Sequence, residues 1–476
     1  MWSAKLFDMK SDRFSTFIRM TGILALFIAL FAGKFSLDRF FLETSRIGWL
    51  ELRIWCTLYA SVAGALLLYK NGIKTYRLSA YEYIYISVLS IYFIYLVGNL
   101  YIIGNPGSRF QTLIDIFIIL ACAYLIILFF RSEKDIVFLA FIAEVTGVIL
   151  FALCLLGFGT PDLNGAGWAP FGGPFTFYRI EFLSFCAALF LYSRSEIPKR
   201  YIPHLAIAGI CLFSTLASLM KIALIGSLVV TLYFLYWLLS TQKIRRAIEI
   251  SFVIIVVLIL PAGGSAVGSG MKRISEVSST DSRFFNMDIT KIYSTSVRFE
   301  DLTETQQDNI KNIGTLLEGT APDYKRDLPG FIRHVTRLSI LNDSTYRINM
   351  AKTAMGYFMR DKWFGAGLGN YSFVSFNSAT NEMETYRYPH NIVLEVLSMT
   401  GLVGIMLFGV AVFITLILLQ QTILRDTNAV FFAGYALFIM ITSLAAGDYY
   451  DFRLFWFISL IVTLSYQQPR EQVKAA

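Results

Sequence analysis

Apolar segments of membrane-spanning length constrain this 476-residue chain more than any other feature. A helix needs about 20 mostly apolar residues to cross a bilayer, and the sequence predicts about twelve such helices. With 56% hydrophobic and only 16% charged residues, the chain has too little polar surface for a soluble protein of this length. We therefore expect an all-α polytopic membrane protein. The predicted spans are approximately 18–36, 47–69, 79–103, 110–130, 135–158, 175–193, 202–217, 219–239, 247–263, 390–420, 428–446 and 453–467.

Positive charge is distributed in a way that is typical of membrane topology. The formal net charge is +8, but Lys and Arg fall in short clusters between the apolar segments. This arrangement does not favour nucleic-acid binding. The basic loops at 69–77, 131–134, 194–200, 242–246 and 423–426 alternate along the chain so that all of them lie on one side. The positive-inside rule predicts that this side is cytoplasmic, together with both termini.

The chain divides into three parts. We expect residues 1–263 to form the first nine transmembrane helices and 390–476 to form the last three with a cytoplasmic C-terminus. Between them, 264–389 is a large polar, partly helical insertion that this topology places on the outer side. Within it, "NDSTYRINMAKTAMGYFMRDKWF" predicts an amphipathic helix, followed by the glycine-rich turn "GAGLGNY". The apolar face of that helix is predicted to hold Ile348, Ala351, Met355 and Phe358.

Several cations are predicted to gather at the outer membrane boundary. Charged groups at membrane depth are costly and usually face a cavity or a partner, so cations gathered on one face favour an anionic ligand. A pyrophosphate suits them, because Arg binds phosphate oxygens bidentately and Lys adds a point charge. The three histidines are too scattered for a zinc site, and no cofactor is expected. The polar residues of this outer set are Arg179, Glu181, Lys221, Arg347, Arg387, His390, Asp448, Asp451 and Arg453.

His390 lies at the predicted start of an apolar helix. The positive end of the helix dipole disfavours imidazolium there, so a neutral ring is available to accept a proton from a sugar hydroxyl. Other interpretations remain open for each residue: His390 as an interfacial hydrogen-bonding residue, Arg179 and Lys221 as snorkelling side chains, and Arg347 as a partner of Asp343 on the same helix face.

The segment "HNIVLEVLSMTGLVG" has a distinctive spacing. His390 and Asn391 are followed by nine residues, Gly401, two residues and Gly404. This spacing resembles the H-N-x9-G-x-x-G signature of the bacterial O-antigen ligase superfamily, which also includes O-antigen and exopolysaccharide polymerases and O-linked oligosaccharyltransferases. The preceding "YRINMAKTAMGYFMRDKWFGAGLGNY" is similar to the Arg-containing helix and glycine-rich turn of that superfamily. Without the resemblance, the two glycines simply allow close helix packing.

The resemblance implies a metal-independent, inverting glycosyltransferase of the bacterial inner membrane. Its donor would be a glycan on undecaprenyl pyrophosphate, and the reaction would occur on the periplasmic side. By motif position, His390 is the catalytic residue and Arg347 binds the pyrophosphate. Lys221 stands where relatives often have a Ser-Arg-Gly element, and Arg179 is assigned from the expected topology. Supporting roles fall on Arg387 and on Asn391, whose side chain is expected to bond to a sugar or to the imidazole.

The acceptor separates two activities. A ligase uses a sugar of lipid A-core, and the signature spacing slightly favours this reaction, whereas a polymerase uses a second lipid-linked glycan. A transporter or flippase for lipid-linked sugars is the alternative of another class. Glu144, near the middle of a predicted helix, is either a buried carboxyl or part of a proton path, and the second reading would suit a transporter. A non-enzymatic scaffold would leave the His-Asn motif unexplained.

Overall fold

The computed structural model describes most of the apolar part of the chain. It covers residues 2–31, 52–71, 80–106, 109–156, 174–194, 197–218, 221–259, 343–377, 382–386, 388–446 and 452–467, with a few single positions between 300 and 326. For Lys221 and Arg347 the backbone is described and the side chain is not. Apart from those few single positions, residues 264–342 of the predicted insertion lie outside the described residues.

Long helices dominate the described residues. One short antiparallel hairpin, β1 (Phe373–Asn377) with β2 (Glu382–Tyr386), is added to them, which the all-α prediction did not include. The helices are α1 (Trp2–Phe31), α3 (Leu52–Asn71), α4 (Ala80–Ile102), α5 (Arg109–Phe129), α6 (Glu133–Leu155), α7 (Pro174–Arg194), α8 (Pro198–Ala217), α9 (Lys221–Ser240), α10 (Ile244–Ile259), α15 (Asp343–Arg360), α16 (Ile392–Arg425), α17 (Val430–Ala446) and α18 (Arg453–Gln467).

Each predicted membrane segment overlaps one of these helices. Within the described ranges, eight helices are long and apolar enough to cross a membrane, namely α1, α3, α4, α5, α6, α9, α16 and α17. Helices α8 and α18 contribute shorter apolar stretches. The chain is therefore a multi-pass helical membrane protein, and twelve crossings remain a prediction.

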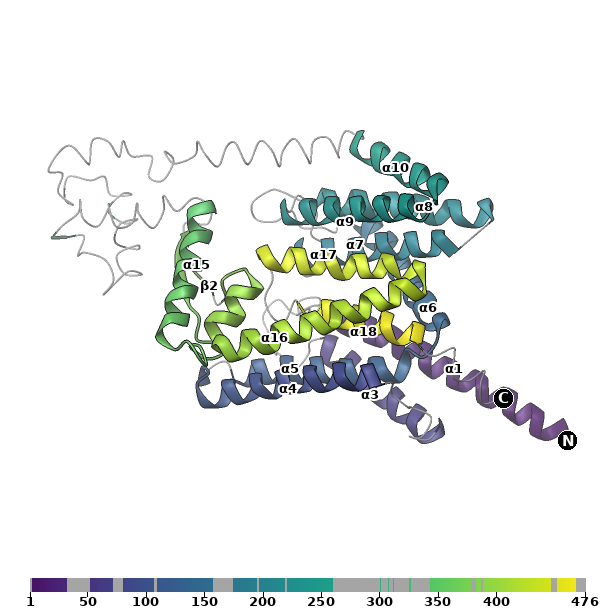
Figure 1. Cartoon of the computed structure of the whole chain (residues 1–476), viewed down its shortest axis with the longest axis horizontal. Helices are drawn as coiled ribbons and strands as arrows, with labels where there is room; N and C mark the ends of the chain where they lie inside the picture. Colours follow the sequence, from purple (N-terminus) through teal and green to yellow (C-terminus); the bar gives the residue numbers. More distant parts are fainter. Residues whose placement is uncertain are drawn as a thin grey trace.

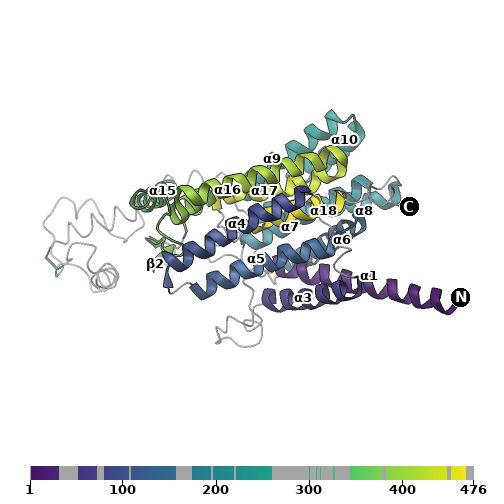
Figure 2. The ribbon, with the colours of Figure 1, turned by 60° about the horizontal axis from the view of Figure 1, so that its bottom comes forward.

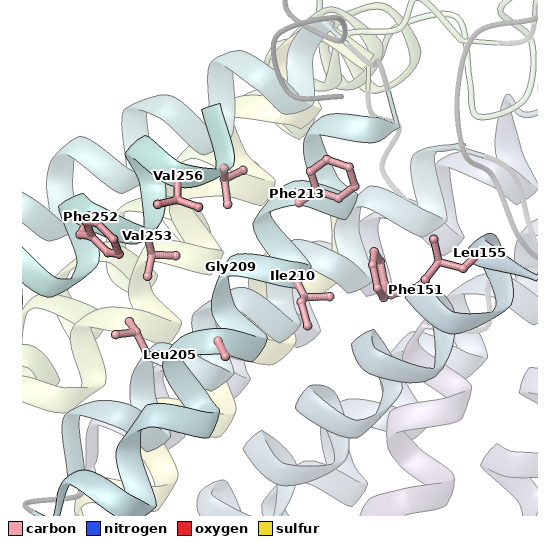
Figure 3. Close-up of a pocket in the computed structure, with 11 residues that line it drawn as sticks. Phe151, Leu155, Leu205, Gly209, Ile210, Phe213, Phe252, Val253 and Val256 are labelled. Carbon is pink, nitrogen blue, oxygen red and sulfur yellow. The ribbon is translucent and has the colours of Figure 1, made fainter. Parts of the chain in front are cut away.

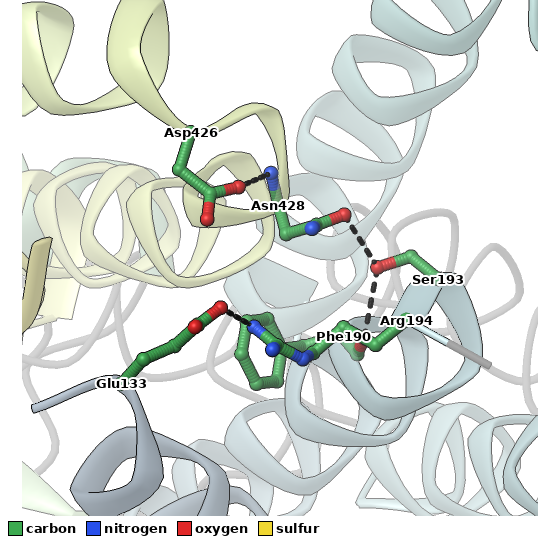
Figure 4. A network of polar contacts seen from close by, with 6 residues as sticks. All are labelled: Glu133, Phe190, Ser193, Arg194, Asp426 and Asn428. Atoms are coloured by element: carbon green, nitrogen blue, oxygen red, sulfur yellow. Dashed lines mark hydrogen bonds and ion pairs between the residues drawn. The ribbon is translucent and has the colours of Figure 1, made fainter.

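Polar side chains join several helices at one end of the bundle (Figure 4). Arg194, the last residue of α7, forms an ion pair with Glu133, the first residue of α6. Ser193 donates a hydrogen bond of 3.0 Å to Asn428, and the Asn428 N–H donates one of 2.7 Å to Asp426. These contacts bring the start of α6, the end of α7 and the link from α16 to α17 together.

Two further contacts place Lys70 and Lys243, which belong to two of the other basic segments, at the same end. Lys70, near the end of α3, donates a hydrogen bond of 2.6 Å to Ser15 of α1. Lys243, after α9, donates one of 3.4 Å to Thr427. Figure 1 shows that α1 also begins at this end of the bundle. The alternation inferred from the charge pattern is therefore present in the fold, and we call this the basic end.

Helix α15 crosses the opposite end of the bundle. In Figure 1 its axis runs across the long axes of the bundle helices, and in Figure 2 α15 and β2 again lie far from the start of α1. Helix α15 packs against α16 and β1. We call this the α15 end.

The buried face of α15 differs from the predicted one. Met350 and Ala354 are buried, whereas Ile348 and Met355 of the predicted apolar face are 53% and 42% exposed. Because α15 crosses the bundle end, it buries the narrow stripe that meets Tyr371, whose hydroxyl donates a hydrogen bond of 3.1 Å to the Met350 carbonyl. The apolar stripe that the sequence predicts is therefore only partly buried, and it is not the stripe that packs most deeply.

Helix α17 lies at the centre of the bundle, in contact with α7, α9 and α18. The rings of Phe182 and Phe438 stack with centroids 3.9 Å apart. A Cβ added at Gly434 would lie 2.2 Å from the Phe234 ring, so only glycine allows α9 to approach α17 this closely. This close packing sets the register of α7 and α9 against α17.

Candidate active site at the α16 corner

Asn391 starts α16 as its N-cap. Its side-chain oxygen accepts a hydrogen bond of 3.0 Å from the Leu394 N–H, which satisfies one of the open donors of the first turn. Its Nδ2 donates to the Leu444 carbonyl at 2.5 Å. The amide oxygen therefore caps α16, and the amide nitrogen ties this cap to the end of α17. These contacts support a structural role for Asn391. They do not test the expected bond to a sugar or to the imidazole.

His390 lies immediately before this cap, at the predicted helix start. Its φ of 52° is in the left-handed region, which is uncommon for residues other than glycine. The ring is half-buried and meets the Tyr388 ring edge-on, with centroids 4.5 Å apart. Strained backbone of this kind persists where the surroundings enforce it, and it is concentrated at functional sites.

Gly401 interrupts α16 and turns it through a corner. Its φ of 66° and ψ of −161° are not helical. A Cβ at this position would lie 2.5 Å from the carbonyl carbon and oxygen of Trp363. Glycine is therefore required by both conformation and space. The first glycine of the signature creates the corner itself, beyond the close helix packing predicted from the sequence.

Backbone hydrogen bonds lock the glycine-rich turn onto this corner. They satisfy carbonyl and N–H groups that lose their helical partners where α16 is interrupted. The four bonds measure 2.8–3.2 Å and run from Ala366 to Ser398, Gly367 to Met399, Leu402 to Lys362 and Val403 to Trp363, naming the N–H donor first.

Asn99, in the last turn of α4, holds the same turn from its other side. Its Nδ2 donates to the Phe364 carbonyl, and its Oδ1 accepts from the Leu368 N–H, both at 2.9 Å. The side chain is buried, and a Cβ at Gly367 would lie 2.6 Å from the Ile103 backbone. The sequence did not indicate a role for Asn99, whose only signal is an amide near the end of an apolar helix.

Arg347 lies one turn before the buried Met350 on α15. Burial raises the pKa of Tyr371, and Tyr357 and the Glu395 carboxyl raise it further, so the phenol keeps its proton and continues to donate to the Met350 carbonyl at neutral pH. This contact fixes the helix that carries Arg347 beside the corner. The side chain of Arg347 and all of Arg387 lie outside the described residues.

The register of α9 against α17 places the backbone of Lys221. The two helices run antiparallel, since Lys243 contacts Thr427 and a Cβ at Gly226 would meet Phe438 and Thr442. Lys221 lies five residues before Gly226 and begins α9, so it is level with the end of α17, where Asn391 bonds. The fold therefore brings the backbone of Lys221 and the start of α16, next to His390, to the same depth.

Arg179 lies deeper in the bundle. It is buried on α7, and its guanidinium lies 5.7 Å from the centroid of the Tyr178 ring. The charges of Arg179 and of buried Arg453 on α18 both act on the Tyr435 hydroxyl. Arg453 also donates a hydrogen bond of 3.0 Å to the Leu30 carbonyl of α1. A second buried arginine therefore accompanies Arg179. The sequence placed Arg453 in the outer polar set but gave it no role in binding or catalysis.

A small difference in depth separates Arg179 from His390. The ring pairs Phe182–Phe438 and Phe190–Phe432 set the antiparallel register of α7 and α17, which puts Arg179 about level with Ile441. Leu444, which bonds to Asn391, is three residues further along α17, or about 4.5 Å at the rise of an α-helix. The backbone of Arg179 therefore lies about one helical turn deeper than that of Lys221.

Neither a metal cluster nor the large apolar groove adds to this site. Within the described ranges, no group of three or more His, Cys, Asp or Glu side chains is arranged to hold a metal. A groove of about 550 Å³ between α6, α8 and α10 is lined by side chains such as Phe151, Ile210, Phe213 and Val253 (Figure 3). Its lining provides no charged side chain for a pyrophosphate.

A known protein family matches the part of the chain that forms this corner. A family model described as O-antigen ligase matches residues 204–409. The match includes α9, α10, α15, the glycine-rich turn and the segment from His390 to Gly404. No curated protein matches the chain significantly.

Proposed function

We propose that this protein, whose residues 204–409 match a family model described as O-antigen ligase, transfers a glycan from undecaprenyl pyrophosphate to an acceptor sugar hydroxyl as a member of the O-antigen ligase/polymerase superfamily. The observation that carries this proposal is the corner itself. The signature residues that resemble the superfamily form one rigid unit, with strained His390 at its exposed edge and Gly401 at its centre. The family match independently supports a glycosyltransferase embedded in a membrane.

His390 acts as the general base in the proposed reaction. A ring nitrogen takes the proton of the acceptor hydroxyl while the hydroxyl oxygen bonds to the anomeric carbon. The bond from that carbon to the pyrophosphate breaks, and the configuration inverts. Because an inverting displacement places base and leaving group on opposite sides of the carbon, a depth offset between His390 and Arg179 suits this chemistry.

Cations stabilise the leaving pyrophosphate. Arg347 and Lys221 belong to helices that approach the corner, and Arg179 lies deeper. Arginine forks and a lysine ammonium supply the positive charge that a metal ion provides in other enzymes. We therefore expect transfer to continue in the presence of EDTA. Activity that disappears in EDTA and returns with Mg²⁺ would contradict this part of the proposal.

The proposed orientation in the membrane follows from the positive charge of the loops at the basic end. Positive loops are retained in the cytoplasm, so the basic end and both termini are assigned to the cytoplasm and the α16 corner to the periplasm of a bacterial inner membrane. A cysteine introduced near the corner, at Ser372, would react with a membrane-impermeant thiol reagent added outside spheroplasts. Labelling only after the cells are opened would reverse the orientation.

The acceptor is proposed to be a sugar of lipid A-core, as in an O-antigen ligase. The alternative is a second lipid-linked glycan, as in a polymerase. Expression in a strain that lacks both activities and makes defined glycans separates the two. New glycan attached to lipid A supports the ligase, and long chains on the lipid carrier support the polymerase. Movement of lipid-linked sugar without any covalent product would support a transporter instead.

A further inference from the structure

Helices α6, α7 and α8 meet around Gly147. A Cβ at Gly147 would lie 2.6 Å from the Ser184 side chain and 2.7 Å from the Cys211 sulfur. Ser184 also donates a hydrogen bond of 2.6 Å to the Ala143 carbonyl. This close contact brings titratable side chains of three helices together inside the bundle.

Glu144 and His204 form an ion pair or a neutral hydrogen bond across α6 and α8, depending on the position of the proton. Nδ1 of His204 lies 2.7 Å from Oε1 of Glu144. The Glu144 side chain is 4% exposed and the His204 side chain 27%. An ionisable group within a membrane bundle is costly unless a partner or a proton compensates it. His204 is therefore the accessible member of this pair, and Glu144 is the buried one.

Glu181 is the most enclosed carboxyl of the set. It is fully buried, and in the described part of the chain no nitrogen or oxygen donor hydrogen-bonds either of its carboxyl oxygens. Its contact is with the Cys211 thiol, which is a weak donor. A charged carboxylate without a partner is strongly disfavoured in such a place. Glu181 therefore holds a proton.

No other titratable group nearby supplies a positive charge that could compensate an ionised Glu181. Cys154 of α6 is within electrostatic range of Glu181, but a thiol is not a cation. Arg179 is two residues before Glu181, which places the two side chains about 200° apart around α7, and its charge acts on Tyr435. Cys186, further along α7, acts on Tyr435 as well. The side of α7 that faces α8 therefore offers no cation to Glu181 among the described residues.

The four side chains are ordered along the bundle axis. His204 is seven residues nearer the basic end of α8 than Cys211, or about 10 Å. The antiparallel contact of Ser184 with Ala143 places Glu181 about two residues, or about 3 Å, beyond Glu144 toward the α15 end. Cys211 contacts Glu181 and is also within electrostatic range of Glu144. The order from the basic end is His204, Glu144, Cys211 and Glu181.

We propose that this chain is a proton-access route from the basic end to a buried proton-binding site at Glu181. A proton that binds a ring nitrogen of His204 makes imidazolium, and the Nδ1 proton then passes to Oε1 of Glu144, which leaves a neutral ring and a neutral carboxyl. Glu144 becomes a carboxylate again as a proton reaches an ionised Glu181 through the Cys211 thiol. One proton moves, and each group except Glu181 returns to its starting state.

The proton on Glu181 has a consequence for α7, which rests on the proposed function. Arg179 and Glu181 are both buried in the same part of α7. Charge is weakly screened in a membrane bundle, so an ionised Glu181 would lower the positive potential around Arg179 even from the other side of the helix. The route thus supplies the proton that keeps this part of α7 positive for an anion.

Infrared spectroscopy of the purified full-length protein tests the site without any glycan. The wild type is expected to show a protonated-carboxyl band at pH 7 that is lost in Glu181→Gln and retained in Glu249→Gln, a control carboxyl at the basic end that accepts a hydrogen bond from Tyr192. If Glu181→Gln leaves the band unchanged, the carboxyl is ionised and the site is overturned.

Isotope exchange tests the route. Transfer to D₂O shifts the Glu181 band as deuterium replaces the proton, and this exchange is expected to slow at least tenfold in Glu144→Gln and in His204→Gln. Both substitutions are close in shape, and thermal unfolding would identify any variant that does not fold. An unchanged exchange rate in either folded variant overturns the route. Because neither measurement involves glycan transfer, failure here is distinct from failure of the proposed function.

Discussion

The two ends of the bundle are held by different kinds of interaction. At the basic end, the ion pair joins Glu133 and Arg194, whose side chains are 43% and 29% exposed. At the α16 corner, backbone groups bond to backbone groups, and glycine leaves the space for them. Side-chain contacts tolerate replacement and are screened by salt, whereas a backbone lock fails when a Cβ is added. The proposed chemistry therefore lies at the end whose contacts are less tolerant of substitution.

Among variants at the two ends, Gly401→Ala is expected to lower transfer activity and stability the most. It adds strain of about 1–3 kcal/mol for a side chain at positive φ and overpacking of about 1–3 kcal/mol against Trp363. Transfer activity should fall at least 100-fold, and thermal unfolding should occur at a lower temperature. Gly409→Ala, in the same helix with no atom within 4 Å of the added Cβ, is the matched control. If the two variants have the same transfer activity and unfolding temperature, the corner at Gly401 is not required for either.

Asn99→Ala should have the next largest effect. It leaves the buried Phe364 carbonyl and Leu368 N–H without their side-chain partner, at about 1–3 kcal/mol for each unsatisfied group. Asn428→Ala at the basic end removes an amide that accepts a single bond from Ser193 and serves as comparison. Denaturation of both variants in the same detergent should show a larger loss of unfolding free energy for Asn99→Ala. The reverse order would contradict the difference between the ends.

Glu133→Gln is expected to have the smallest effect. A half-exposed ion pair contributes about 0–1 kcal/mol, so the variant should keep nearly wild-type stability and activity. A double-mutant cycle with Arg194→Gln would measure the coupling, which should decrease further at high salt. A coupling above about 2 kcal/mol would show that the basic end is as rigidly built as the corner.

Much of the helical architecture could be predicted from sequence because membrane-spanning length is a local property. Apolar runs of about 20 residues and clusters of Lys and Arg are visible without knowledge of any contact. The helix start at Asn391 was also accessible, since an Asn before an apolar run is a good N-cap. The spacing to Gly401 indicated a special glycine, but its corner depends on the Trp363 backbone, about 40 residues earlier in the chain.

Contacts between distant segments could not be predicted in the same way. Glu144 and His204 are separated by 60 residues, and nothing in either helix alone indicates their pairing. The two depths of Arg179 and Lys221 follow from helix register, which depends on interlocking rings such as those of Phe182 and Phe438. The most deeply buried residues of α15 could not be identified from the sequence, because an exposed apolar stripe and a buried one have the same periodicity.

The most direct test of the central claim is the transfer rate of a His390 variant. His390→Asn suits this test, because asparagine also tolerates the left-handed conformation at φ 52° but cannot act as the base. His390→Ala provides a second variant without any side-chain nitrogen. The rate would be measured with a purified polyprenyl-pyrophosphate-linked glycan and a lipid A-core acceptor, and folding would be checked by thermal unfolding. The account predicts a loss of at least about 100-fold in both folded variants; transfer at the wild-type rate would contradict it.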